Sequence, residues 1–250
     1  MLATFCLRLA CGLIAALLML SPTQVPPRFF RVQYLTALAL LAVAVFFLRD
    51  LADARLWTLL TVSMVLAFAG SIVWHVDGHP GQRLVLVLAN IALLGTLLVG
   101  GPAARGGDTD TPWPAVDDVA SAAVLGAATS AMLMGHAYLI APAMSLSPLY
   151  RLLGALGALL VARIILAGLG LYWWTGRHAA GTLETEMVLW LSVRWIVGLI
   201  GPLVLGWMAW ETARIRSTQS ATGILYVVVI LGFLGELTSQ LLLEKTGFIL

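Results

Sequence analysis

Charged residues are scarce in this chain: they make up 10% of its 250 residues, whereas 61% of the residues are hydrophobic. Soluble domains are about half apolar and about a quarter charged, so no soluble core could hide this much apolar surface. The net charge of only +2 is spread along the chain, and we therefore expect no nucleic-acid partner. Lipid must be the solvent for most of the chain.

Cysteine is also nearly absent, and the sequence motifs that identify common enzymes are missing. The two cysteines, Cys6 and Cys11, make no disulfide framework, and their C-x4-C spacing on one helix is a poor zinc site. The chain contains no H-E-x-x-H, G-x-S-x-G, P-loop or C-x-x-C-H sequence. These absences favour a non-catalytic subunit over an enzyme. The connections between the apolar segments leave no room for a soluble domain, so we expect any chemistry within the bilayer or at its edges.

Long apolar segments dominate what remains, and eight of them have about the length of a membrane-spanning helix. The predicted spans are residues 3–20, 33–49, 56–75, 83–100, 117–141, 149–174, 187–210 and 221–243. The first span is similar to a signal peptide, but no small-x-small cleavage site precedes Ser21, so we expect it to be retained. The sequence thus predicts an all-α, polytopic integral membrane helix bundle of about eight transmembrane helices, forming a single domain over residues 1–250.

Small residues and one proline predict how some of these helices pack. Ala127, Ala131 and Gly135 recur at four-residue spacing, which lets helix backbones approach closely in lipid. Gly198 precedes a Gly-Pro pair in the seventh span, and Pro202 should kink that helix because its ring clashes with the preceding turn. We therefore expect close helix contacts in the fifth and seventh spans.

Three ionisable residues lie inside predicted spans, where a charge is costly enough to indicate a function: Arg163, Arg194 and Glu236. A helical rise of about 1.5 Å per residue places them at neighbouring depths, roughly 10–16 Å from the face that carries both termini. The simplest arrangement is an Arg194–Glu236 ion pair with Arg163 nearby, and Gln240 one turn beyond Glu236 would extend this polar face. The cluster either fixes helix packing, forms a pocket for an anionic or quinone-like ligand, or relays protons through Glu236.

Histidines form a second group toward the opposite face. His75 and His79 flank a turn with the sequence H-V-D-G-H, and His136 lies beside the small residue Gly135 in the fifth span. Two histidines on facing helices next to small residues are what axial ligation of a b-type haem requires, so His136 with His75 or His79 could bind haem. His75 and His136 are also the candidate metal ligands. The alternative is ordinary: interfacial histidines are common, and His136 could simply bond a carbonyl across a helix interface.

Membrane orientation is poorly encoded, because Lys and Arg divide evenly between the two faces and the positive-inside rule does not distinguish them. We refer to the face that carries both termini as face A and to the opposite face as face B. Acidic residues are concentrated on face A, and the T-A-R-I-R-S-T-Q-S loop on face B has a cytoplasmic character. We therefore expect face B inside the cell and both termini outside.

Two stretches, GHAYLIAPAMSLSPLYR (135–151) and RWIVGLIGPLVLGWMAWETARIRSTQSATGILYVVVILGFLGEL (194–237), resemble an uncharacterised family of bacterial polytopic membrane proteins. The resemblance covers about half of the chain, from the fifth span onward, and implies a multi-pass location in the bacterial inner (cytoplasmic) membrane. It brings no established activity with it. More loosely, eight short-looped spans with a few histidines are similar in shape to membrane anchor subunits of electron-transfer complexes.

Three functions fit these patterns. The first is a membrane subunit of a respiratory or photosynthetic electron-transfer complex, which binds haem b or quinone near His136, His75 or His79 and docks with other subunits. The second is a small proton-linked transporter that uses Arg163, Arg194 and Glu236. The third is a structural membrane subunit without chemistry. In all three the lipid bilayer is the main partner.

Overall fold

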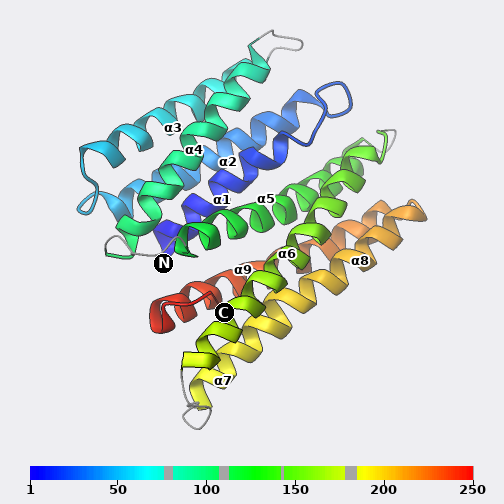
Figure 1. Ribbon diagram of the computed structural model, residues 1–250. Coiled ribbons are helices and arrows are strands. Elements are labelled where there is room, and N and C mark those ends of the chain that lie inside the picture. The colour runs from blue at the N-terminus through cyan, green and yellow to red at the C-terminus, as the bar shows by residue number, and fades with distance from the viewer. Residues whose placement is uncertain (76–80, 107–112, 142–143, 178–184, 250) are drawn as a thin grey trace.

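The computed structural model describes residues 1–75, 81–106, 113–141, 144–177 and 185–249, and within these ranges the chain is helical with no strands. The helices are α1 (Leu2–Leu17), α2 (Pro27–Leu48), α3 (Ala54–Val73), α4 (Gln82–Ala104), α5 (Trp113–Ile140), α6 (Ser147–Arg177), α7 (Thr185–Ser192), η1 (Val193–Ile200), α8 (Gly201–Arg214) and α9 (Thr218–Thr246) (Figure 1). α7, η1 and α8 follow one another without a break. The predicted all-α bundle is confirmed.

Among the described residues, seven helices are long and apolar enough to cross a membrane, counting 185–214 as one helix, so the chain is a multi-pass membrane protein. The first predicted span differs from the others. α1 ends at Leu17 and has 16 residues, which gives a length of about 24 Å, less than the ~30 Å of a bilayer core. Most of its residues are buried, because α1 packs between α2, α4 and α5 rather than against lipid.

The helices form two rings of four. In the first ring α1 packs on α2, α2 on α3, α3 on α4, and α4 returns to α1. In the second ring α5 packs on α6, α6 on α8, α8 on α9, and α9 returns to α5. The rings meet along α1 and α5, which run in the same direction and begin at the same end of the bundle (Figure 1). The second half of the chain therefore repeats the arrangement of the first, although the sequence shows no visible repeat.

Two glycines allow α1 and α5 to approach this closely. A Cβ atom on Gly12 would lie 1.8 Å from the carbonyl oxygen of Ala122, and one on Gly126 would lie 2.0 Å from the carbonyl of Gly12. No side chain fits at either position, so the backbones are in direct contact at the crossing. The predicted small-residue stripe of α5 is buried, and Gly135 at its end packs against Thr222 of α9.

A second backbone contact joins the seventh and eighth spans. A Cβ atom on Gly198 would lie 2.5 Å from the Cα atom of Gly235 on α9. Gly198 belongs to η1, a π-helical segment directly ahead of Pro202, where the sequence predicts a kink. Proline has no N–H to continue the ordinary helical ladder, and the chain has wider turns there. Such π-helical segments are often found at functional sites.

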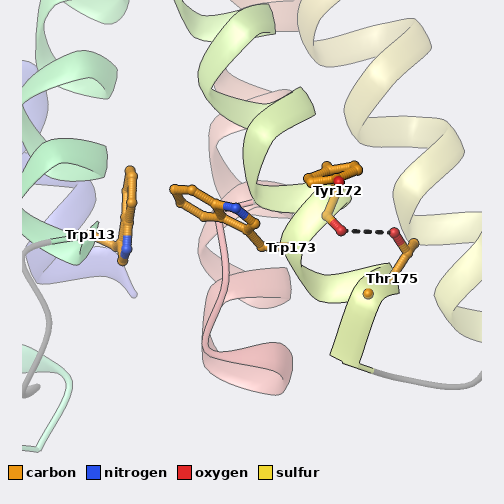
Figure 2. A pocket seen from close by; sticks show the side chains of 5 residues that line it. Trp113, Tyr172, Trp173 and Thr175 are labelled. Carbon is orange, nitrogen blue, oxygen red and sulfur yellow. Dashed lines mark hydrogen bonds between the residues drawn. The ribbon is translucent and has the colours of Figure 1, made fainter.

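Aromatic side chains gather at the helix ends near face A. Figure 2 shows Trp113 at the start of α5 facing Trp173 near the end of α6, with ring centroids 4.7 Å apart and the rings inclined by 65°. Tyr172 points to the other side of α6, and its carbonyl accepts a 3.0 Å hydrogen bond from the Thr175 hydroxyl. These residues line an open cavity of about 570 Å³. Their position is that of an aromatic belt at a membrane surface.

Candidate functional site

A cluster of charged side chains lies buried where the two rings meet. We call it the charge cluster; its members are Arg8 of α1, Arg105 directly after α4, Asp117 and Asp118 of α5, Arg163 of α6, Arg194 of η1 and Glu236 of α9. All except Arg105 are at most 3% exposed, and the Arg105 side chain is 11% exposed. Residues far apart in the chain thus place ionised groups at one site in the interior.

Arg8 is the centre of the charge cluster. Its Nε donates to Asp118 Oδ1 at 2.9 Å, and its Nη2 donates to Asp118 Oδ1 at 2.6 Å and to Asp117 Oδ2 at 2.5 Å. Its Nη1 makes an ion pair with Glu236 Oε1 and lies 3.3 Å from the Ser121 hydroxyl. One guanidinium of the first ring therefore holds three carboxylates of the second ring.

Other polar groups surround this centre. Arg105 binds Asp118 with both terminal nitrogens, at 2.9 and 2.8 Å. Arg163 forms an ion pair with Asp117 and donates to the hydroxyls of Ser121, at 2.8 Å, and Ser239, at 3.2 Å. Both aspartates of α5 are therefore bound by two arginines each.

The polar face of α9 completes the charge cluster. Gln240 Nε2 donates to Glu236 Oε1 at 3.1 Å, and Arg194 Nη1 donates to the carbonyl of Gly235 at 3.2 Å. Within the described residues, Arg105 Nε, Arg163 Nη1 and Gln240 Oε1 are buried and have no hydrogen-bond partner. Buried polar atoms are nearly always paired, so the site keeps two arginine donors and one amide acceptor for water or a ligand.

The charge cluster lies in the half of the bundle nearer face A. Arg8 follows the first residue of α1 by six positions, and Asp117 follows the first residue of α5 by four. At about 1.5 Å per residue these positions are roughly 9 Å and 6 Å along their helices. Ionised groups at such a depth are expensive to bury, and each carboxylate of the charge cluster is accordingly paired with arginine.

The structure brings the predicted residues Arg163, Arg194, Glu236 and Gln240 into one site, but with different pairing. The ion pair predicted between Arg194 and Glu236 is corrected: Glu236 is paired with Arg8, and Arg194 is bonded to the adjacent Gly235 carbonyl. The reason is that α1 lies in the interior of the bundle and brings Arg8 next to Glu236, whereas the sequence pattern places Arg8 near the membrane surface.

Sequence reasoning missed Arg8, Arg105, Asp117 and Asp118. Hydropathy places the two aspartates at the very edge of the predicted span 117–141, next to a polar loop, whereas α5 already begins at Trp113 and includes them in its first two turns. Pro114 was the available signal, because proline is favoured in the first turn of a helix. With α5 starting there, both aspartates belong to a spanning helix.

The histidines do not meet in the interior. His136 is exposed on α5, and His75 is exposed after α3, with its Nδ1 3.1 Å from Arg31 Nη1. His79 and the centre of its H-V-D-G-H turn lie outside the described residues. Within the described residues no group of three or more His, Cys, Asp or Glu side chains could hold a metal ion. Haem binding through His136 stays a prediction.

No family model, curated protein or solved structure matches the chain. The resemblance of residues 135–151 and 194–237 to bacterial polytopic membrane proteins therefore stays a prediction, and function must be argued from the geometry of the residues themselves.

Proposed function

We propose that this membrane protein transfers protons through the charge cluster, in the manner of a small proton-linked transporter. The observation that carries the proposal is the position of Arg8, whose guanidinium on the first ring binds Asp117, Asp118 and Glu236 on the second. Arginine stays protonated, so the carboxylates are the groups that exchange protons. Protonation of one carboxylate weakens an ion pair between the rings and thereby links proton uptake to their movement.

Glu236 is the carboxylate best placed for this role. Asp117 and Asp118 each have a second arginine partner, Arg163 and Arg105 respectively, whereas the ion pair of Glu236 is with Arg8. Glu236 also accepts a hydrogen bond from the neutral side-chain amide of Gln240. Glu236 therefore requires the smallest loss of ion pairing when it becomes neutral.

The surrounding fold supports a transporter. Gly235, next to Glu236, touches Gly198 of the π-helical segment η1, so the carboxylate lies beside an irregular stretch of helix. Transporters often contain repeated helix units, with the site for the coupling ion between them near the middle of the membrane. The two four-helix rings match this arrangement in that the charge cluster lies at the junction between them, although it is nearer face A than the middle of the membrane.

Proton flux into vesicles tests the proposal. In vesicles with an imposed potassium diffusion potential, the wild-type protein should acidify the lumen, and Glu236→Gln should slow this flux at least about tenfold, an increase of about 1.4 kcal/mol in the barrier. Glu211→Gln is the matched control, because Glu211 is exposed near the end of α8 and lies outside the charge cluster. Equal fluxes for wild type and a correctly folded Glu236→Gln variant would contradict the proposal.

A cavity at face B supports a second candidate, the quinone-binding subunit of an electron-transfer complex. It has a volume of about 690 Å³ and is lined by Pro26, Pro27, Arg28, Arg31, Trp74 and His75, which is within the usual range for small-molecule sites. Arg31 and His75 supply hydrogen-bonding groups for a quinone oxygen. Trp74 is held rigidly because it stacks on Phe30, with ring centroids 3.9 Å apart.

Extraction and spectroscopy of the purified protein test this candidate. We expect quinone to be recovered from an organic extract of the wild type and to be lost in His75→Ala, while His136→Ala retains it because His136 does not line this cavity. A reduced-minus-oxidised haem b band that disappears in His136→Ala would support the haem hypothesis instead. Protein that yields neither quinone nor haem would contradict the redox candidate.

A further inference from the structure

Positive charge is concentrated at face B, the end of the bundle opposite the charge cluster. The arginines at this end are Arg28, Arg31, Arg83, Arg151, Arg214 and Arg216. Within the part of this end that the structure describes, Glu211 is the acidic side chain. At face A, by contrast, Arg8 and Arg105 are neutralised inside the charge cluster. The even division of basic residues in the sequence thus becomes an excess of exposed positive charge on face B.

Three of these arginines surround one cavity. Arg151 near the start of α6 and Arg214 and Arg216 at the end of α8 line an open space of about 690 Å³. Arg214 also binds Glu211 at 3.0 Å, but the two side chains of this ion pair are 63% and 42% exposed, so the pair is weak. Even with Glu211 included, the cavity has two more positive than negative charges.

Two features of the backbone lie beside this cavity. Arg216 has a φ of 58°, in the left-handed region, in the turn between α8 and α9. Ser147, the first residue of α6, also lines the cavity, and the free N–H groups of a helix N-terminus attract phosphate. Guanidinium groups bind phosphate oxygens with two parallel hydrogen bonds, so Arg151 and Arg216 match this ligand.

Aromatic residues place the cavity at the level of lipid headgroups. The rings of Tyr150 and Trp210, which also line it, have centroids 5.0 Å apart. Tyrosine and tryptophan at helix ends mark the boundary between the hydrocarbon core and water. Next to them Trp207 and Ile215 are 65% and 79% exposed, which gives the acyl chains of a bound lipid an apolar surface.

We propose that this cavity binds the phosphate group of an anionic phospholipid headgroup. Basic pockets between transmembrane helices bind such headgroups at the cytoplasmic side, where the leaflet is negatively charged. The excess of exposed arginine on face B agrees with a cytoplasmic position for this face. The site is separate from the charge cluster, and its occupancy does not depend on proton transfer.

Lipid titration of the detergent-solubilised protein tests the proposal. We expect native mass spectrometry to detect bound phosphatidylglycerol in preference to phosphatidylcholine, and Arg151→Gln combined with Arg216→Gln to weaken phosphatidylglycerol binding about tenfold. The matched control is Arg49→Gln combined with Arg55→Gln, which removes two exposed arginines from face A and should leave binding unchanged. Arg216→Gly is a second variant, because glycine adopts the left-handed conformation without strain and only the charge is lost.

Three outcomes would overturn the proposal. Equal binding of phosphatidylglycerol and phosphatidylcholine would exclude headgroup selection, and unchanged binding in both Arg216 variants would exclude the cavity as the site. Competition with inorganic phosphate distinguishes a site for a lipid headgroup from a site for a soluble anion. If millimolar phosphate displaces no lipid, the ligand is the membrane phospholipid, whereas phosphate that binds in place of phosphatidylglycerol would identify a site for a soluble anion.

Discussion

Replacing Arg8 by methionine is expected to lower the free energy of unfolding by about 3–5 kcal/mol, the usual loss when one partner of a buried ion pair is removed. The Arg8 side chain is fully buried, and its guanidinium holds Asp117, Asp118 and Glu236 together. In the variant Arg163 and Arg105 still neutralise the two aspartates, but Glu236 loses its ion pair. Thermal or denaturant unfolding in mixed micelles measures the loss.

A double-mutant cycle separates the ion pair from the packing of the Arg8 side chain. Arg8→Met combined with Glu236→Gln removes the cation and the carboxylate together, so the double variant should be more stable than the sum of the two single losses predicts. Arg49→Met is the control: the Arg49–Asp50 pair is exposed, so its loss should have little effect. If Arg8→Met and Arg49→Met unfold alike, Arg8 does not organise the charge cluster.

The helices were predictable because spanning segments are encoded locally. The last span was predicted at residues 221–243 and α9 covers Thr218–Thr246; the fifth was predicted at 117–141 and α5 covers Trp113–Ile140. In lipid every backbone N–H and C=O must be satisfied within its own helix, so an apolar run of sufficient length decides the structure. The length and interior position of α1 depend instead on neighbouring helices, which hydropathy does not reveal.

The charge cluster was only partly predictable. Arg163, Arg194 and Glu236 were identifiable because each is a charged residue within an apolar run. A charge at such a position is costly to bury in the membrane and therefore indicates a function. Arg8 has the pattern of an ordinary basic residue near a chain terminus, and its partners are 109 and 228 positions away in the sequence. Such pairing follows from the meeting of α1 with the second ring, which no local pattern encodes.

Replacing Gly126 by alanine is expected to separate α1 from α5 and to destabilise the junction of the two rings. The added Cβ atom would lie 2.0 Å from the carbonyl of Gly12, and no rotamer change relieves the clash, because the helix backbone fixes the Cβ position and the neighbouring atoms are backbone atoms. Overpacking of this kind typically costs about 1–3 kcal/mol, occasionally more. Gly12→Ala should behave in the same way, because its Cβ atom would lie 1.8 Å from the carbonyl oxygen of Ala122.

Gly232→Ala provides the matched control, since a Cβ atom at Gly232 of α9 would have no neighbour within 4 Å. Alanine is favoured over glycine in a helix by up to about 1 kcal/mol, so this variant should be as stable as the wild type or more stable. The same chemical change is thus expected to have opposite signs at the two positions. Gly126→Ala should also loosen the contact of Arg8 with Asp117, because the crossing and the charge cluster share α1 and α5. If Gly126→Ala were as stable as Gly232→Ala, the rings would not meet through a glycine contact, and the coupling of proton uptake to ring movement would lose its structural basis.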